Sequence, residues 1–447
     1  MFLSLYYSTT MTNLAPSVLE AGLPIEPLAE SLSLLATTDN VVQRVTVRCP
    51  VANSSTIGPS TLIQFRFRGG ADVFDLTSAR ITWGGMSCSS TTNTVRFMNG
   101  FPIAYSMELK LNEQSLAIVN DADLVRIMAH FARGDTVNVS EATQGYGTAA
   151  QRQLWGATAR DYSIPIGSYF VGAHSFPAFT HGSELTLEVQ LAAAVDCMET
   201  ATAATVPTYT GAVASTYLSY DALVIRPEAK KAFLAPFTNA DGSLNPIPFM
   251  FKTWRTSSSV VLAAATDAEL VSSIRSASLT DVWAIARPQA TLSTLATLNR
   301  IEDYRFPTLL SLQLDLNGVQ YPSQRVLCTA ANGFEAYSYV MRQLHHSDAL
   351  VGPAYGASPV DQSLISVIGW TGTLASGIDK CLLAWNVQRN DTGEPNHITG
   401  VDTSQASSDL RIRLTFTNVP VNETYTIISW MQVRVMRLPS GSIIVQR

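Results

Sequence analysis

Residues 101–112 read FPIAYSMELKLN, and residues 306–317 read FPTLLSLQLDLN. Six of the twelve positions are identical at a constant offset of 205 residues. Both copies alternate apolar with polar residues and end in Asn, which is typical of a β-strand with one buried face that runs into a turn. A repeat of this kind indicates a duplicated architecture if other segments recur in the same order.

Two further pairs of segments repeat in the same order. Residues 183–191, SELTLEVQL, resemble residues 408–416, SDLRIRLTF, at an offset of 225. Residues 219–225, SYDALVI, resemble residues 429–435, SWMQVRV, at an offset of 210. Offsets that drift by up to about twenty residues are expected where loops of variable length join matching strands. The sequence therefore predicts one domain built twice.

Length and composition agree with two domains and indicate partners. The chain has 447 residues, which suggests two or three domains, and the repeat selects two. Only 14% of the residues are charged, compared with about 25% in an average soluble domain. We expect neither a membrane span nor a cleaved signal peptide, because no apolar run is long enough and the opening residues lack a basic stretch.

The charged residues exclude one class of function. The net charge is −6, and most basic residues are arginines rather than lysines. No run of basic residues is present that would neutralise a row of phosphates, so specific nucleic-acid binding is not expected.

Alternating patterns place the secondary structure. Strands are predicted at residues 42–47, 62–67, 80–83, 94–97, 106–111, 185–191, 217–225, 410–416 and 426–436. Short helices are predicted at 28–35, 121–131, 228–234 and 332–344, and the repeated strand is followed in both halves by an Asn turn, a loop and a helix. Residues 133–180 and 347–362 are expected to be long excursions between strands.

These elements predict an all-β fold of two tandem antiparallel jelly-roll sandwiches, with short helices in long inter-strand loops. The expected domain limits are an N-terminal arm at 1–40, a first jelly roll at 41–228, a Pro-rich linker at 229–248 and a second jelly roll at 249–447.

A tandem pair of this kind resembles the double jelly-roll major capsid proteins of tailless icosahedral DNA viruses, the lineage that includes nucleocytoplasmic large DNA viruses, virophages and polinton-like elements. The segments that carry the likeness are 312–318 with Tyr321-Pro322, the partner strand 107–112, and the closing strand pairs of each half. The first copy departs from the second, since Asn112 is followed by Glu113 where Asn317 is followed by Gly318.

The resemblance implies a structural function. In that family three subunits form a homotrimer with a pseudo-hexagonal outline, and these capsomers tile an icosahedral capsid in the virion, which is assembled in the host cytoplasm or nucleus. The implied partners are the other subunits, neighbouring capsomers, and penton and minor capsid proteins. The loops at 133–180 and 347–362 would form the outward towers, and the arm at 1–40 would touch neighbours, minor proteins or an internal membrane.

Motifs of other functions have simpler explanations. The tripeptide Arg133-Gly134-Asp135 matches an integrin-binding motif, but we expect a plain turn. Four glycosylation sequons begin at Asn53, Asn138, Asn390 and Asn422, and we expect them to stay bare in a shell assembled in the cytosol.

No catalytic, cofactor or metal site is predicted. Asp121 and Asp123 are read as a helix start rather than as an acid and base pair. The histidines are expected to be polar loop residues: His130, His174, His181, His345, His346 and His397. The cysteines are expected to be free thiols: Cys49, Cys88, Cys197, Cys328 and Cys381. The tryptophans are expected in the core or at interfaces: Trp83, Trp155, Trp254, Trp283, Trp370, Trp385 and Trp430.

Two other functions stay open at this point. A tandem sandwich is also suited to a receptor- or glycan-binding attachment protein. A double-barrel cupin enzyme pairs two jelly rolls as well, but cupins hold a metal with clustered His and a carboxylate on adjacent strands, and the predicted strands here carry almost no His. The capsid function ranks first and the enzyme last.

Overall fold

The computed structural model describes most of both halves of the chain. The described residues are 40–68, 70–89, 95–98, 100–124, 142–147, 149–156, 158–170, 175–182, 184–200, 207–242, 244–289, 308–328, 383–388, 400–405, 409–438, 440 and 442–446. The expected arm, the helices at 28–35 and 332–344, and the loop at 347–362 lie outside them.

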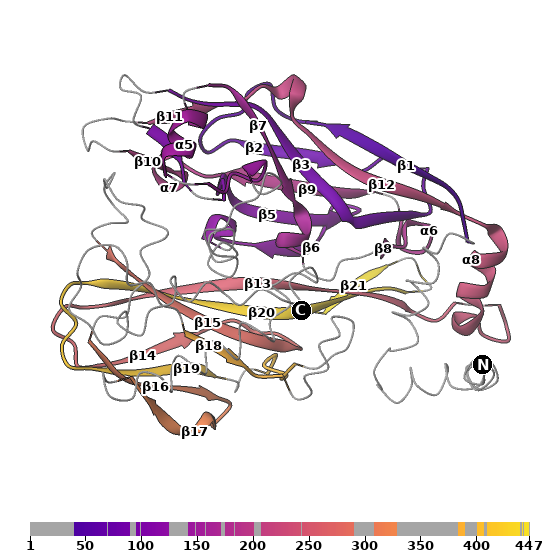
Figure 1. The fold of residues 1–447 in the computed structure, drawn as a ribbon. Helices are drawn as coiled ribbons and strands as arrows, with labels where there is room; N and C mark the ends of the chain where they lie inside the picture. Colours follow the sequence, from indigo (N-terminus) through magenta and orange to yellow (C-terminus); the bar gives the residue numbers. More distant parts are fainter. Residues whose placement is uncertain are drawn as a thin grey trace, which may run out of the picture.

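The first half is a sandwich of two antiparallel sheets (Figure 1). One sheet has the order β1 (Val41–Pro50), β12 (Tyr217–Ile225), β3 (Val73–Ser89) and β7 (Arg160–Pro165). The other has the order β2 (Leu62–Arg66), β9 (Leu185–Leu191), β5 (Ala104–Leu111) and β6 (Gln114–Val119). Alternate side chains of these strands are buried between the sheets, as the period-2 pattern predicts.

The second half repeats this topology strand for strand. One sheet has the order β13 (Ile247–Val261), β20 (Glu423–Arg437), β15 (Leu279–Pro288) and β18 (Leu383–Asn386). The other has the order β14 (Asp267–Ser272), β19 (Leu410–Phe416), β16 (Leu309–Leu316) and β17 (Val319–Leu327). Numbered along the chain within each half, the eight strands form sheets 1-8-3-6 and 2-7-4-5 in both halves. The predicted pair of jelly rolls is confirmed.

The rolls also contain shorter strands and helices. The additional strands are β4 (Val95–Phe97), β8 (Ser175–Phe176), β10 (Met198–Thr200), β11 (Thr208–Thr210) and β21 (Ile443–Gln446). The helices are α5 (Ala149–Gly156), α6 (Ala178–His181), α7 (Ala194–Cys197) and α8 (Pro227–Leu234), with 3₁₀ turns η2 (Ile166–Ser168), η3 (Val213–Ser215) and η4 (Ala235–Phe237). The helix predicted at 228–234 is α8, so this prediction is confirmed. The domain limits themselves stay predictions.

Both copies of the repeated stretch end in the same turn. Asn112 and Glu113 have φ values of 47° and 64°, and Asn317 and Gly318 have 54° and 78°. A two-residue hairpin loop with positive φ at both positions is a type I′ turn, which favours Asn and Gly and matches the twist of the flanking strands. In each roll the backbone N–H of this Asn donates to the carbonyl of the residue just before the neighbouring strand. Asn112 N lies 3.0 Å from Glu184 O, before β9, and Asn317 N lies 3.0 Å from Asp409 O, before β19.

The strand register follows the sequence repeat. Leu109 pairs with Leu187, and Leu314, its copy 205 residues later, pairs with Ile412. The register shift in β5 between Ala104 and Ser106 also recurs, at the same offset, in β16. The 205- and 225-residue offsets found in the sequence are therefore the offsets of paired strands in three dimensions.

One ion pair between neighbouring strands recurs with its charges exchanged. Lys110 Nζ lies 2.7 Å from Glu188 Oε2 in the first roll. At the corresponding positions of the second roll, Arg413 Nη2 lies 3.3 Å from Asp315 Oδ2. An ion pair thus joins the same two strand positions in both rolls, and it forms whichever of the two positions carries the basic residue.

Two sequence expectations are wrong in detail. The Asn turns lead into strands β6 and β17 rather than into loops, because each turn reverses the chain directly onto the preceding strand. The segment 133–180 is not only an excursion, since β7 pairs with β3 and buries Tyr162 and Ile164. The alternation of polar and apolar residues at 160–165, Arg-Asp-Tyr-Ser-Ile-Pro, is the sequence signal that indicates this strand.

We predict equal losses of stability from truncating the repeated core leucine in either roll. Leu109 and Leu314 are both fully buried, so Leu109→Ala and Leu314→Ala are each expected to lower the free energy of unfolding by about 2–5 kcal/mol. Denaturant titration followed by tryptophan fluorescence measures this change. Val271→Ala, at a half-exposed strand position, is the control and should cost less than about 0.5 kcal/mol. A loss at only one leucine would contradict the equivalence of the rolls.

Candidate functional site: the junction between the two rolls

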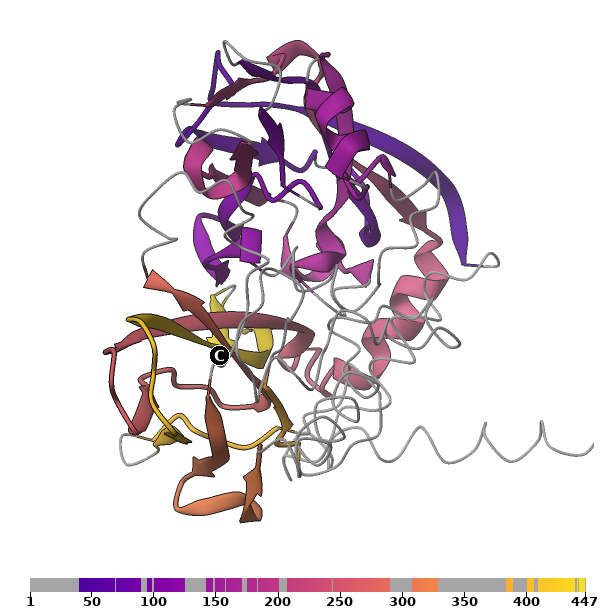
Figure 2. The same ribbon diagram turned by 60° about the vertical axis from the view of Figure 1, so that its left-hand side comes forward.

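The two rolls lie side by side, the first above the second in the view of Figure 1, and Figure 2 shows the same arrangement after rotation. Strand β6, at one edge of the first roll, lies against β13 and β20 of the second. Strand β1 lies at the far side of the first roll, and β17 lies at the opposite end of the molecule. Each roll therefore meets the other with a different surface.

Aromatic side chains fill this junction. The ring of Phe176 lies 5.2 Å from that of Phe249, and the ring of Phe170 lies 6.1 Å from that of Phe251. These phenylalanines come from the segment around β8 and from β13, and all four are buried. Edge-to-face pairs of this kind add about 0.5–1.5 kcal/mol beyond their buried area. Sequence reasoning missed them, although the nearly unbroken apolar run at the start of β13 is typical of a strand buried on both faces.

His181 belongs to the junction and is not a polar loop residue. It ends α6 and is 1% exposed, between the rings of Phe176 and Phe249. Burial lowers the pKa of His181 to about 4, so the ring is neutral at physiological pH. The expectation from sequence is wrong here because the second roll packs onto α6 and helps to bury this side chain.

Polar contacts cross the junction beside the aromatic ones. Thr256 Oγ1 on β13 donates to the carboxylate of Asp121, which follows β6. Arg437 Nη1 on β20 donates to the carbonyl of Thr180 on α6. Gln114 Nε2 on β6 donates to the carbonyl of Ile443 on β21 at 3.3 Å. Contacts along the whole length of the junction therefore hold the two rolls together.

Asp123 is a buried carboxyl at the same junction. A helical turn begins at residue 122, as predicted, and residues 125–131 of the expected helix lie outside the described part of the chain. Asp123 is 8% exposed, and its Oδ1 has no hydrogen-bond partner among the described residues. Burial, followed by the nearby charge of Asp121, raises the pKa of Asp123 to about 8, although Arg287 of β15 partly offsets this. The carboxyl is therefore mostly protonated at neutral pH, unlike the anion that a helix start favours.

The link between the rolls is itself packed. Phe233 of α8 and Phe237 of η4 join Leu223 and Ile225 of the first roll and Ile247 of the second in one apolar cluster. Lys230 of α8 also forms an ion pair with Asp72, at 2.6 Å. The segment that connects the rolls thus contributes to the contact between them.

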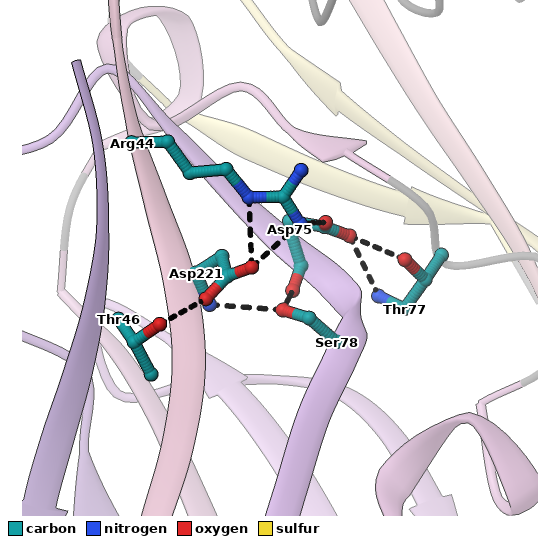
Figure 3. A network of polar contacts seen from close by, with 6 residues as sticks. All are labelled: Arg44, Thr46, Asp75, Thr77, Ser78 and Asp221. Carbon is teal, nitrogen blue, oxygen red and sulfur yellow. Dashed lines mark hydrogen bonds and ion pairs between the residues drawn. The ribbon is translucent and has the colours of Figure 1, made fainter.

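The corresponding sheet of the first roll is not covered in the same way. In the second roll, nearly every residue in the first half of β13 and most residues of β20 are buried. In the first roll, most residues of β1 are exposed. Figure 3 shows the surface that β1, β12 and β3 present instead, a polar network centred on Arg44. Arg44 Nε donates to Asp221 Oδ2 at 2.8 Å, and its Nη2 also reaches Asp75 at 3.4 Å.

The network is ordered by hydroxyl groups as well as by charge. Thr46 Oγ1 donates to Asp221 Oδ1 at 2.7 Å, and with Arg44 it holds the pKa of Asp221 below its usual range. Ser78 Oγ donates to the carbonyl of Asp75 and accepts from the amide of Asp221. We call this surface, defined by Arg44, Thr46, Asp75, Ser78 and Asp221, the Arg44 face.

The remaining motifs of the sequence lie partly outside the described residues. Arg133-Gly134-Asp135, the sequons at Asn138 and Asn390, and the remaining five histidines lie outside the described residues. Asn53 accepts from the amide of Gln64 at 2.7 Å and donates to Leu62, so its side chain ties a loop to β2. Asn422 accepts from the amide of Ala263 at 2.9 Å. That the sequons stay bare remains a prediction.

Thiols and tryptophans agree with the expectations where they are described. None of Cys49, Cys88, Cys197 and Cys328 forms a disulfide among the described residues. The indole rings of Trp83, Trp254, Trp283 and Trp430 are fully buried in the core. Within the described ranges, no group of three or more His, Cys, Asp or Glu side chains is placed to hold a metal ion. No described helix is both long and apolar enough to span a bilayer.

We predict that Asp123 makes stability depend on pH. The folded-state pKa of about 8 exceeds the unfolded value of about 3.9, so the unfolded chain releases this proton first. Stability therefore falls as pH rises from about 4 to about 8 and levels off above that. Asp123→Asn removes this decline and is expected to stabilise the protein by about 1–3 kcal/mol at pH 8. Thermal unfolding from pH 5 to pH 9 measures the difference.

The exposed Asp267 supplies the control for this series. Asp267→Asn removes a carboxylate from an exposed strand position and is measured in parallel. Parallel profiles for Asp123→Asn and the parent would show that Asp123 is ionised in the folded protein and would refute the prediction.

Comparison with known proteins gives structural matches only. No protein-family model matches the sequence, and no curated protein sequence matches it. The PBCV-1 virus capsid is similar in structure at 11% identity, with a TM-score of 0.55 over 90% of this chain and 96% of that chain. The Faustovirus major capsid protein is similar at 10% identity, with a TM-score of 0.52 over 94% of this chain and 98% of that one. The chain therefore has the fold of these capsid structures across nearly its whole length, as two tandem jelly rolls.

Proposed function

We propose that this protein is a structural major capsid protein, which forms trimeric pseudo-hexagonal capsomers that tile an icosahedral shell. The observation that carries the proposal is the side-by-side contact, through different surfaces, of two jelly rolls with the same strand order in one chain. The fold shared with the PBCV-1 and Faustovirus capsid structures over nearly the full length supports the same function.

The geometry explains why duplication suits such a shell. A contact between two different surfaces is heterologous, and its repetition gives a closed ring when the rotation between neighbours closes. Three chains with two similar rolls each present six similar edges around a threefold axis. A hexagonal outline lets identical units fill a surface, whereas a single roll per chain would need six separate subunits.

The surface and the partners follow from this function. A charged fraction of 14% suits a subunit that is covered on several sides, since obligate interfaces resemble a domain core cut in half. In this proposal the partners are two further copies in the capsomer, neighbouring capsomers, and penton and minor capsid proteins. The protein acts in the virion and carries out no reaction.

We predict a discrete trimer in solution. Size-exclusion chromatography with light scattering is expected to give three times the chain mass of 48.3 kDa. Negative-stain images of the same peak should show particles with a hexagonal outline. A stable monomer at micromolar concentration that forms neither trimers nor shells would overturn the capsid function. A saturable signal on a glycan array from such a monomer would instead support an attachment protein.

A further inference from the structure

We infer that, between copies, the free edge of β17 in one chain packs against the Arg44 face and β1 of the next chain. This inference rests on the proposed trimer and specifies which surfaces form it. The second copy of the chain is the occupant of both surfaces.

The first step is the equivalence of β6 and β17. Each is the return strand of the repeated hairpin, each follows the same type I′ turn, and each forms one edge of its sheet. Their first residues, Gln114 and Val319, are separated by the same 205 residues as the rest of the repeat. Strand β17 can therefore form the same kind of contact with another roll as β6 forms within the chain.

The second step is the position of β6 inside the chain. It lies against β13 and β20, the first and last strands of the second roll. Gln114 begins β6 and donates to Ile443 of β21, and Asp121, just after β6, accepts from Thr256. The first and last strands of the first roll are β1 and β12, which carry Arg44 and Asp221. A copy of the internal contact thus brings β17 onto this sheet.

The third step is that both surfaces are exposed in the part of the chain that the structure describes. Val319 and Leu327 on β17 are 53% and 43% exposed. On β1, Val42 is 63% exposed. Apolar side chains this exposed on two edge strands favour burial between protein surfaces, and two edge strands that stay bare are sites of association. Figure 1 places β1 and β17 at opposite ends of the molecule, so one chain cannot join them.

Charge complements the apolar contacts. The Arg44 face holds two carboxylates, Asp75 and Asp221, beside the guanidinium group of Arg44, and β1 also carries the exposed Arg48. Strand β17 carries one charged residue, Arg325, which is exposed. Opposite charges on facing patches fix the register of an association and raise its rate, and they disfavour the pairing of like faces.

The test maps contacts between copies in the full chain. A photoreactive p-benzoylphenylalanine replaces Val319 or Leu327, and unlabelled and ¹⁵N-labelled chains are mixed so that mass spectrometry identifies cross-links between copies. Both probes are expected to react with residues 41–50 or 217–225 of another copy. Val271, which is 51% exposed on the opposite edge strand β14, is the control position and should give no cross-link to these strands.

A charge variant tests the same contact without a probe. Arg325→Glu is expected to raise the concentration for half-dissociation of the trimer by about tenfold at low salt, and Arg325→Lys should leave it near the parent value. Circular dichroism of each variant checks that the rolls stay folded.

The outcomes separate this inference from the proposed function. A trimer whose Val319 and Leu327 probes react elsewhere, including with residues 1–39, overturns the inference and leaves the capsid function standing. An unchanged dissociation midpoint for Arg325→Glu also counts against the inference. A protein that is monomeric throughout overturns both.

Discussion

The second roll depends on a sheet that needs cover on both faces. Most of β20 and the first half of β13 are buried, and a sandwich by itself covers only one face of each sheet. The first roll supplies the other cover through the rings around β8, the edge strand β6 and the buried carboxyl of Asp123. The tandem arrangement is therefore a condition of stability for the second roll rather than a loose tether between independent domains.

The same constraint makes the two ends of the chain unequal. The second roll's β13 and β20 carry Phe249, Phe251 and Trp430, whereas the first roll's β1 and β12 carry Arg44 and Asp221. A sheet face that is always covered within the chain can be apolar, but a face that meets water before assembly must stay polar to remain soluble. The apolar sheet of the second roll is thus the one covered when the chain folds, and the polar sheet of the first roll is the one left exposed for a partner.

The repeated pattern of apolar residues predicted a large part of this structure. Leu109 and Leu314 fall at the same register positions because alternation fixes which side chains face the core, and a slip of one residue would reverse every side chain. The Asn residues at positions 112 and 317 marked the turns correctly. The pattern did not show that β6 and β17 follow those turns, because their outer residues are too mixed to alternate clearly, nor that β7 closes the first roll.

By itself, then, the sequence determined that the chain is one fold used twice, because strand periodicity and turn residues are local properties that survive in both copies. The junction was decided only by the tertiary structure. His181 and Asp123 have ordinary sequence surroundings, but in the folded protein each also lies near residues more than sixty positions away in the chain, Phe249 for His181 and Arg287 for Asp123. Burial and pKa depend on what packs across the interface, and no local pattern encodes that. The same reason explains why the exposed Arg44 face and the free edge of β17 could be recognised only once both rolls were placed together.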